Sequence, residues 1–190
     1  MYRAPNIEGY YAIYIVVILY RIDNGLLNKY RFVINMHEYT LDDVFNTIDR
    51  YKLFVLPCEF NQFEGTNLKL ITEKIPVLNI GRELAEYINK LDDLKYVNMD
   101  SQRFINDSIN RQSVTKNNTL NKAIAIYNIG ILLEPTMQLN ATTLLKDLSK
   151  THSLIIIWEH LIEVSDRLNW PINKKYCLDF SDIHLKKIHI

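Results

Sequence analysis

The sequence predicts an α/β fold, a three-layer sandwich in which helices cover both faces of a mainly parallel sheet. Three observations lead to this prediction: short apolar runs alternate with amphipathic segments, no internal repeat is visible, and only five glycines and five prolines interrupt 190 residues. Strands buried on both faces of a parallel sheet are apolar throughout, and their alternation with helices is typical of βαβ units. We therefore expect a sheet of about five strands with right-handed crossovers.

The first half of this pattern predicts two strand–helix pairs after an opening helix. The segment TLDDVFNTIDRY (40–51) predicts that helix, because Thr40 can cap it and because Asp42 and Asp43 lie in its first turn, where the helix dipole favours negative charge. The elements expected next are a strand at 52–56, a helix at 66–74, a strand at 75–80, a helix at 82–91 and a further helix near 101–111, followed by a loop at 112–118.

The second half predicts three more strands. They are expected at 123–133, 154–158 and 175–180, with helices between them at 139–149, capped by Asn140, and at 159–168. Trp158 and Trp170 are expected to be core or interface aromatics. Glu159 and His160 follow a strand, where ligand-binding residues of α/β sheets lie, but neither a nucleophile elbow nor a metal-ligand pattern accompanies them.

The apolar run YYAIYIVVILY (10–20) precedes this domain. It has eleven residues between Glu8 and Arg21, whereas a membrane-spanning helix needs about 17–25. We interpret residues 1–35 either as an N-terminal extension carrying an extra strand or as a translated segment upstream of a true start at Met36. Residues 36–190 are expected to form a single domain. Neither a membrane partner nor a secretory leader is predicted.

Charge and cysteine content indicate the class of partner. Lys and Arg together number 22, as do Asp and Glu, so the formal net charge is zero and the basic excess typical of nucleic-acid binders is absent. Such a charge is compatible with a homo-oligomer or with a subunit of a complex. The only basic hint is HLKKIHI (184–190). Cys58 and Cys177 form no CxxC motif, which favours reduced thiols in a cytoplasmic protein.

The stretch LFVLPCEFNQFEGTN (53–67) is a strand that runs into a loop. A phosphate-binding loop has the form GxxxxGK[ST], in which backbone amides and the lysine hold phosphate and the hydroxyl ligates Mg²⁺. The best superposition places Phe60 at the first glycine and Gly65 at the second, while Thr66 replaces the lysine and Asn67 replaces Ser/Thr. The loop is therefore a degenerate copy at best.

The segments 75–91 and 123–160 resemble BrxF, the small P-loop protein of type 3 BREX phage-defence systems. The resemblance covers roughly residues 38–180. In that family an apolar strand ends in an acidic DNIE-type motif, and a Leu-Phe-x-Pro turn, a helix ending in Leu-Ser and a basic residue, and a strand ending in Trp follow. The equivalents here are Tyr127–Gly130, Leu133–Pro135, Leu148–Lys150 and Ile157–Trp158. The resemblance implies a P-loop NTPase-like fold in which Tyr127 stands for the Walker B aspartate and Gly130 for the glutamate that follows.

The resemblance implies an accessory subunit of a BREX-type defence complex that acts mainly through protein contacts and contacts nucleic acid only indirectly. Its vestigial nucleotide site would comprise Gly65, Thr66 and Asn67, with Asn128 near the degenerate Walker B position. No catalytic residue, metal or cofactor is assigned; ATP and ADP are the candidate ligands. Two alternatives stay open: an ATPase completed by residues of a partner, and a small regulatory or DNA-associated module unrelated to nucleotides.

Overall fold

The computed structural model describes residues 39–59, 62–116, 118–160, 162, 166–170 and 176–190, and the backbone of two short strands at 15–17 and 32–34. The chain divides into two compact units, Met1–His37 and Glu38–Ile190. In the first unit, β1 (Ile15–Val17) pairs antiparallel with β2 (Phe32–Ile34). β1 lies inside the predicted strand at 10–20; the rest of that run and Met36 lie outside the described residues.

A five-stranded sheet forms the centre of the second unit. In spatial order its strands are β4 (Val77–Asn79), β5 (Ala123–Tyr127), β6 (Ser153–Trp158), β3 (Leu53–Pro57) and β9 (Lys186–Lys187), and all four pairings are parallel. β3, the first strand of this sheet along the chain, thus lies between β6 and β9, the last two. In register, Val55 of β3 is opposite Ile156 on one side and Lys187 on the other.

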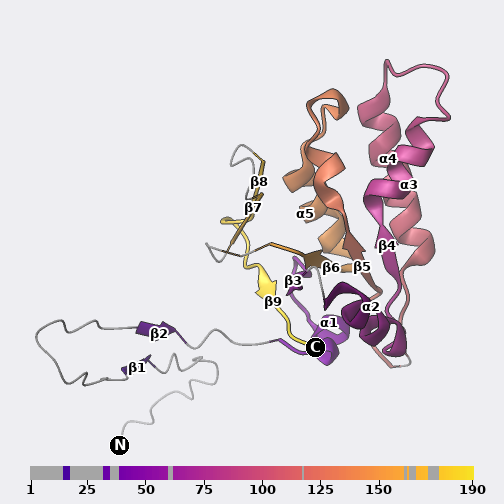
Figure 1. Cartoon of the computed structure of the whole chain (residues 1–190). Helices are drawn as coiled ribbons and strands as arrows, with labels where there is room; N and C mark the ends of the chain where they lie inside the picture. The colour runs from indigo at the N-terminus through magenta and orange to yellow at the C-terminus, as the bar shows by residue number, and fades with distance from the viewer. Residues whose placement is uncertain are drawn as a thin grey trace, which may run out of the picture. The chain divides into compact units, whose positions relative to one another are not determined.

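Helices cover both faces of this sheet, which confirms the predicted α/β class and is compatible with three layers (Figure 1). Alternate residues of β3 point to opposite faces: Leu53 and Val55 pack with helices α3 (Ile80–Ile88), α4 (Val97–Gln112) and α5 (Ala141–Thr151), whereas Phe54 and Leu56 pack with α1 (Leu41–Asn46) and α2 (Phe63–Thr72). Each fully buried aliphatic side chain contributes about 1.5–3 kcal/mol to folding.

The predicted helix caps are confirmed. The Thr40 hydroxyl accepts from the Asp43 backbone N–H, and the Asp43 carboxylate accepts from the Thr40 N–H at 2.7 Å, which makes a capping box at α1. Asn140 accepts from the backbone N–H of Thr143 at the start of α5. However, α1 ends at Asn46, five residues before the predicted end of the helix at 51, and Ile48 beyond it is 89% exposed.

Two expectations for the second half were wrong. The run 123–133 is not one strand: β5 stops at Tyr127, Asn128 takes a left-handed conformation, and a 3₁₀-helix, η2 (Ile129–Leu133), and a second, η3 (Pro135–Met137), follow. The described residues of the segment 159–168 are not helical. Its last two residues belong to a strand, β7 (Arg167–Asn169). The strand expected at 175–180 is present as β8 (Cys177–Asp179), but it lies outside the main sheet and pairs antiparallel with β7.

The fifth strand, β9, was not predicted because its two residues are lysines. Lys186 is only 2% exposed; its ammonium pairs with the Asp49 carboxylate at 3.0 Å and donates to the Tyr51 backbone oxygen at 2.8 Å. The segment read as a basic patch therefore directs one of its two lysines inward, toward the amino end of β3.

Candidate functional site

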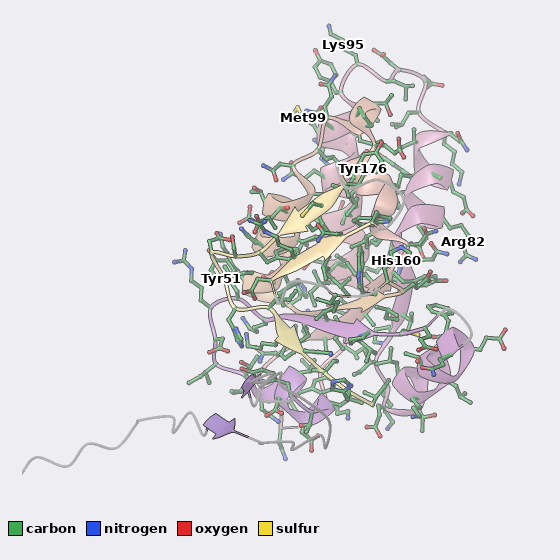
Figure 2. All side chains as sticks on the ribbon, turned by 60° about the vertical axis from the view of Figure 1, so that its left-hand side comes forward. Tyr51, Arg82, Lys95, Met99, His160 and Tyr176 are labelled. Carbon is green, nitrogen blue, oxygen red and sulfur yellow. The ribbon has the colours of Figure 1, made fainter. Side chains whose placement is uncertain are left out.

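The candidate site lies at the carboxyl edge of the sheet, where open α/β folds bind ligands. Figure 2 shows His160, which follows β6, and Arg82, in the first turn of α3, toward one end of the strands, and Tyr51, which precedes β3, toward the other. The loop from β3 to α2 and the segment after β5 belong to the same edge as His160, because the strands are parallel.

The predicted phosphate-loop residues lie inside helix α2. This helix begins at Phe63, three residues earlier than predicted. In an α-helix the backbone N–H groups beyond the first turn donate to carbonyls four residues back. Of Gly65, Thr66 and Asn67, only Gly65 therefore keeps an amide outside the ladder. A Cβ at Gly65 would have no protein atom within 4 Å, so the packing around this glycine leaves space for a side chain. Phe60 lies outside the described residues.

The side chains of Thr66 and Asn67, in this helix, differ in their hydrogen bonds. The Cys58 thiol, at the end of β3, is 3.4 Å from the Thr66 hydroxyl and donates to it, which links the loop to α2. Asn67 Oδ1, in contrast, is buried and accepts from no described residue.

An aromatic contact joins the start of α2 to the end of β5. The rings of Phe63 and Tyr127 have centroids 4.6 Å apart, and both pack on the cluster that includes Phe54 and Leu56. Tyr127 is the position that the BrxF resemblance equates with the Walker B aspartate. An aromatic ring in contact with Phe63, rather than a carboxylate, therefore occupies this position at the end of β5.

Asn128 belongs to a hydrogen-bonded junction beyond β4 and β5. Its amide donates to Asn79 Oδ1 at 3.3 Å, Asn79 Nδ2 donates to the Tyr127 hydroxyl at 3.1 Å, and Asn79 Oδ1 also accepts from the Arg82 backbone N–H at 2.9 Å as the cap of α3. Asn128 has φ 56°, a left-handed conformation that asparagine tolerates better than most residues. The residue is thus part of a hydrogen-bonded turn that joins β4, β5 and the start of α3.

A pocket of about 130 Å³ opens beside Asn128, between the ends of β5 and β6. Its walls come from the segment after β5, from the end of β6 and the two residues that follow it, and from the residue after β7. The lining residues are Asn128, Ile129, Gly130, Ile157, Trp158, Glu159, His160 and Trp170. The sequence indicated Glu159 and His160 only by their place after a strand. It gave no sign that Trp170, from another segment, would join them, because that contact is made by tertiary packing.

The rings in this pocket contact one another edge to face. The indoles of Trp158 and Trp170 have centroids 4.5 Å apart at an interplanar angle of 87°, and the imidazole of His160 lies 5.2 Å from Trp158 at 89°. Trp158 is buried, as expected for a core aromatic, yet its indole Nε1 has no hydrogen-bond partner among the described residues.

The described residues were also compared with the requirements of a metal site and of a membrane-spanning helix. No group of three or more His, Cys, Asp or Glu side chains among the described residues converges to hold a metal ion. Within the same residues, no helix combines the length and apolar character needed to cross a membrane.

Comparison with protein-family models, with curated proteins and with solved structures gives no match for this chain. The fold and site therefore define the chain as an α/β protein with a mainly parallel five-stranded sheet and a small aromatic pocket at its carboxyl edge.

Proposed function

We propose that this chain is a non-hydrolysing protein with a P-loop NTPase-like fold that acts through protein contacts, as an accessory subunit of a BREX-type phage-defence complex. The resemblance of residues 38–180 to BrxF motivates the defence role. The strand order supports the fold: β6 lies between β3, which would carry the phosphate loop, and β5, which would carry the acidic motif. One large class of P-loop NTPases has this arrangement, and the likeness is an analogy of fold.

The contact between Phe63 and Tyr127 is the main observation that supports the proposal that this chain does not hydrolyse nucleotides. In an active P-loop enzyme a lysine in the first turn of the helix and an aspartate at the end of the strand that β5 would represent face the phosphates and Mg²⁺. Here the first turn begins with Phe63, the strand ends in Tyr127, and their rings are 4.6 Å apart. Glu59 and Glu64, which flank the turn from β3 into α2, would repel a triphosphate.

An exposed apolar tip supports a role in protein contacts. Leu94, Tyr96 and Met99, in and after the turn that joins α3 to α4, are 56%, 55% and 56% exposed. Figure 2 shows Met99 and the neighbouring Lys95 at the far end of this helical hairpin. Adjacent large apolar side chains that remain in water are typical of surfaces that bind another protein.

Calorimetric titration with ATP and ADP, each with and without Mg²⁺, tests the absence of a working nucleotide site. We expect no binding at millimolar nucleotide. Gly65→Trp would obstruct the helix start and Gly65→Ala is its matched control, since the position has open space around it. Micromolar, Mg²⁺-dependent binding that is lost in Gly65→Trp and kept in Gly65→Ala would overturn the proposal. The chain would then be a nucleotide sensor or an ATPase completed by a partner.

Co-expression with the proteins encoded by the flanking genes tests the role in a complex. We expect one of them to co-elute with this chain in size-exclusion chromatography, and the double variant Tyr96→Ser/Met99→Ser to abolish co-elution. The control Ile71→Ser alters a side chain on α2 that is equally exposed, at 56%. Flanking genes unrelated to defence, together with no co-elution, would refute the assignment.

A further inference from the structure

The amino edge of the sheet gathers cationic side chains, although the formal net charge of the chain is zero. Lys52 comes directly before β3, Lys122 comes directly before β5, and Lys150 lies in the last turn of α5. With Arg50 they form what we call the basic edge, at the opposite end of the strands from the aromatic pocket. We propose that the basic edge binds the phosphate backbone of a single-stranded nucleic acid. This inference goes beyond the proposed function and does not rest on it.

The hydrogen bonds of the sheet place these cations in a row. The start of β6 is bonded on both sides: Ser153 N–H donates to the Lys122 oxygen at 2.8 Å, and Leu154 N–H donates to the Lys52 oxygen at 2.9 Å. Because neighbouring strands lie about 4.8 Å apart, the backbones of the two lysines are separated by roughly 10 Å. The Lys52 ammonium then reaches the Lys150 carbonyl oxygen at 2.7 Å. A row of separate charges suits an extended anion better than a single phosphate ion.

Few carboxylates neutralise this row. Of the nearby acidic side chains, Asp49 is already held by the buried Lys186 at 3.0 Å, and Asp147 pairs with Lys150 at 2.6 Å. No described carboxylate forms an ion pair with the other three cations of the basic edge. The edge therefore carries an excess of positive charge, which attracts anions and raises their local concentration.

A buried histidine responds to the same charges. His152 is 4% exposed and directly precedes β6. Burial lowers its pKa, the positive charge of Lys122 lowers it further, and Lys52 adds a smaller effect in the same direction. Because both lysines act on one imidazole, their fields overlap at the start of β6. An anion bound there would reduce this repulsion.

The ring of Tyr51 favours a nucleic acid over other polyanions. It is half-buried beside the row, with Arg50 Cζ 5.4 Å and Lys150 Nζ 5.7 Å from its centroid, and Figure 2 shows it at the opposite end of the strands from His160. Surfaces that bind single strands combine cations for the backbone with aromatic rings and guanidinium planes on which bases stack. An acidic peptide would use the charges without the ring. Since ammonium groups are point charges that contact phosphates, we expect little dependence on base sequence.

Fluorescence anisotropy of the full chain with two labelled single-stranded DNA oligonucleotides of unrelated sequence tests this inference. We expect both to bind with dissociation constants of about 10⁻⁴–10⁻⁵ M, within the range of non-specific binding. Each phosphate contact on a single strand contributes about −0.7 to the slope of log K against log salt, so three or four contacts predict a slope of about −2 to −3.

Two double variants that each remove two positive charges locate the site. Arg50→Gln/Lys122→Gln alters two exposed cations of the basic edge, and the slope should become less steep by about 1.4. Lys90→Gln/Lys95→Gln is the matched control: both lysines are exposed, and Figure 2 shows Lys95 at the far end of the helical hairpin. The control should keep the slope of the parent chain. Circular dichroism verifies that both variants are folded.

Any of three results would overturn this inference. They are no saturable change in anisotropy up to about 10⁻³ M protein, well above the range of non-specific binding, equal slopes for the two double variants, and displacement of the oligonucleotide by poly-glutamate as efficiently as by unlabelled DNA. The last result would indicate an acidic protein as the partner. ATP attracted only to the basic edge would still bind Gly65→Trp, so the calorimetric test of the α2 turn remains distinguishable.

Discussion

The backbone of Gly81 approaches the side chain and the backbone of Asn128 so closely that a Cβ on Gly81 would lie 2.6 Å from Asn128 Nδ2 and 2.7 Å from the Asn128 carbonyl oxygen. Helix α3 thus packs on the left-handed turn that follows β5 at a distance only glycine allows. The same turn forms one wall of the aromatic pocket, so the packing of α3 helps to hold that wall in place.

Replacing Gly81 with alanine tests this close approach. The added methyl group must displace the backbone of Asn128, and overpacking of this kind costs about 1–3 kcal/mol. The matched variant Gly65→Ala adds the same group to a helix with open space around it, where alanine stabilises by about 0.5–1 kcal/mol. Urea unfolding of the two variants should give changes of opposite sign. Equal effects would show that α3 does not pack in this way.

The two asparagine caps predict unequal losses of stability. Asn140→Ala removes one cap hydrogen bond, to Thr143 N–H at 3.0 Å, and should cost about 1 kcal/mol. Asn79→Ala also removes the bonds to Tyr127 and Asn128, so it should cost about 2 kcal/mol. Thermal unfolding measures both. If the two variants lost the same stability, the junction beyond β4 and β5 would contribute nothing.

The ion pair of Asp49 and Lys186 predicts a dependence of stability on pH. The hydrogen bond from Lys186 lowers the pKa of Asp49 below its ordinary 3.8, against the opposing effect of burial. Because the pKa is lower in the folded chain, the pair stabilises the fold above about pH 4, and this contribution is lost as the pH falls through the folded pKa. The carboxylate is 55% exposed, so solvent screening limits the effect to about 1 kcal/mol.

Asp49→Asn measures that contribution. Urea unfolding at neutral pH should show the variant about 1 kcal/mol less stable than the parent chain, and the difference should close in acid well below pH 4. Asp107→Asn, at an exposed position on α4, is the control and should change little at either pH. A difference that persists in acid would mean that the carboxylate charge is not what stabilises β9.

Local signals predicted the elements whose causes are local. Thr40 and Asn140 cap helices through residues three positions away, and the apolar runs at 52–56 and 154–158 became buried neighbouring strands. The start of α2 was misplaced because its N-cap residue, Gln62, provides no side-chain cap hydrogen bond. β9 was missed because its lysines give no strand pattern and pair with β3 only through tertiary structure.

The candidate site shows the same division. The carboxyl edge of the sheet could be predicted from the alternation of strands and helices. The pocket could not, because Trp158 and Trp170 come from separate segments and meet only in the folded chain. The nucleotide role of Gly65, Thr66, Asn67 and Asn128 stays a prediction.

The position of β3 between β6 and β9 has a consequence for folding. Its partners β6 and β9 lie about 100 and 130 residues further along the chain. Contacts that distant in sequence form slowly, because long loops must close first. During synthesis the apolar segment Leu53–Leu56 leaves the ribosome well before either neighbouring strand exists, with both of its edges unpaired. We therefore expect this short strand to be the main target of chaperones, and the place where aggregation starts when folding is delayed.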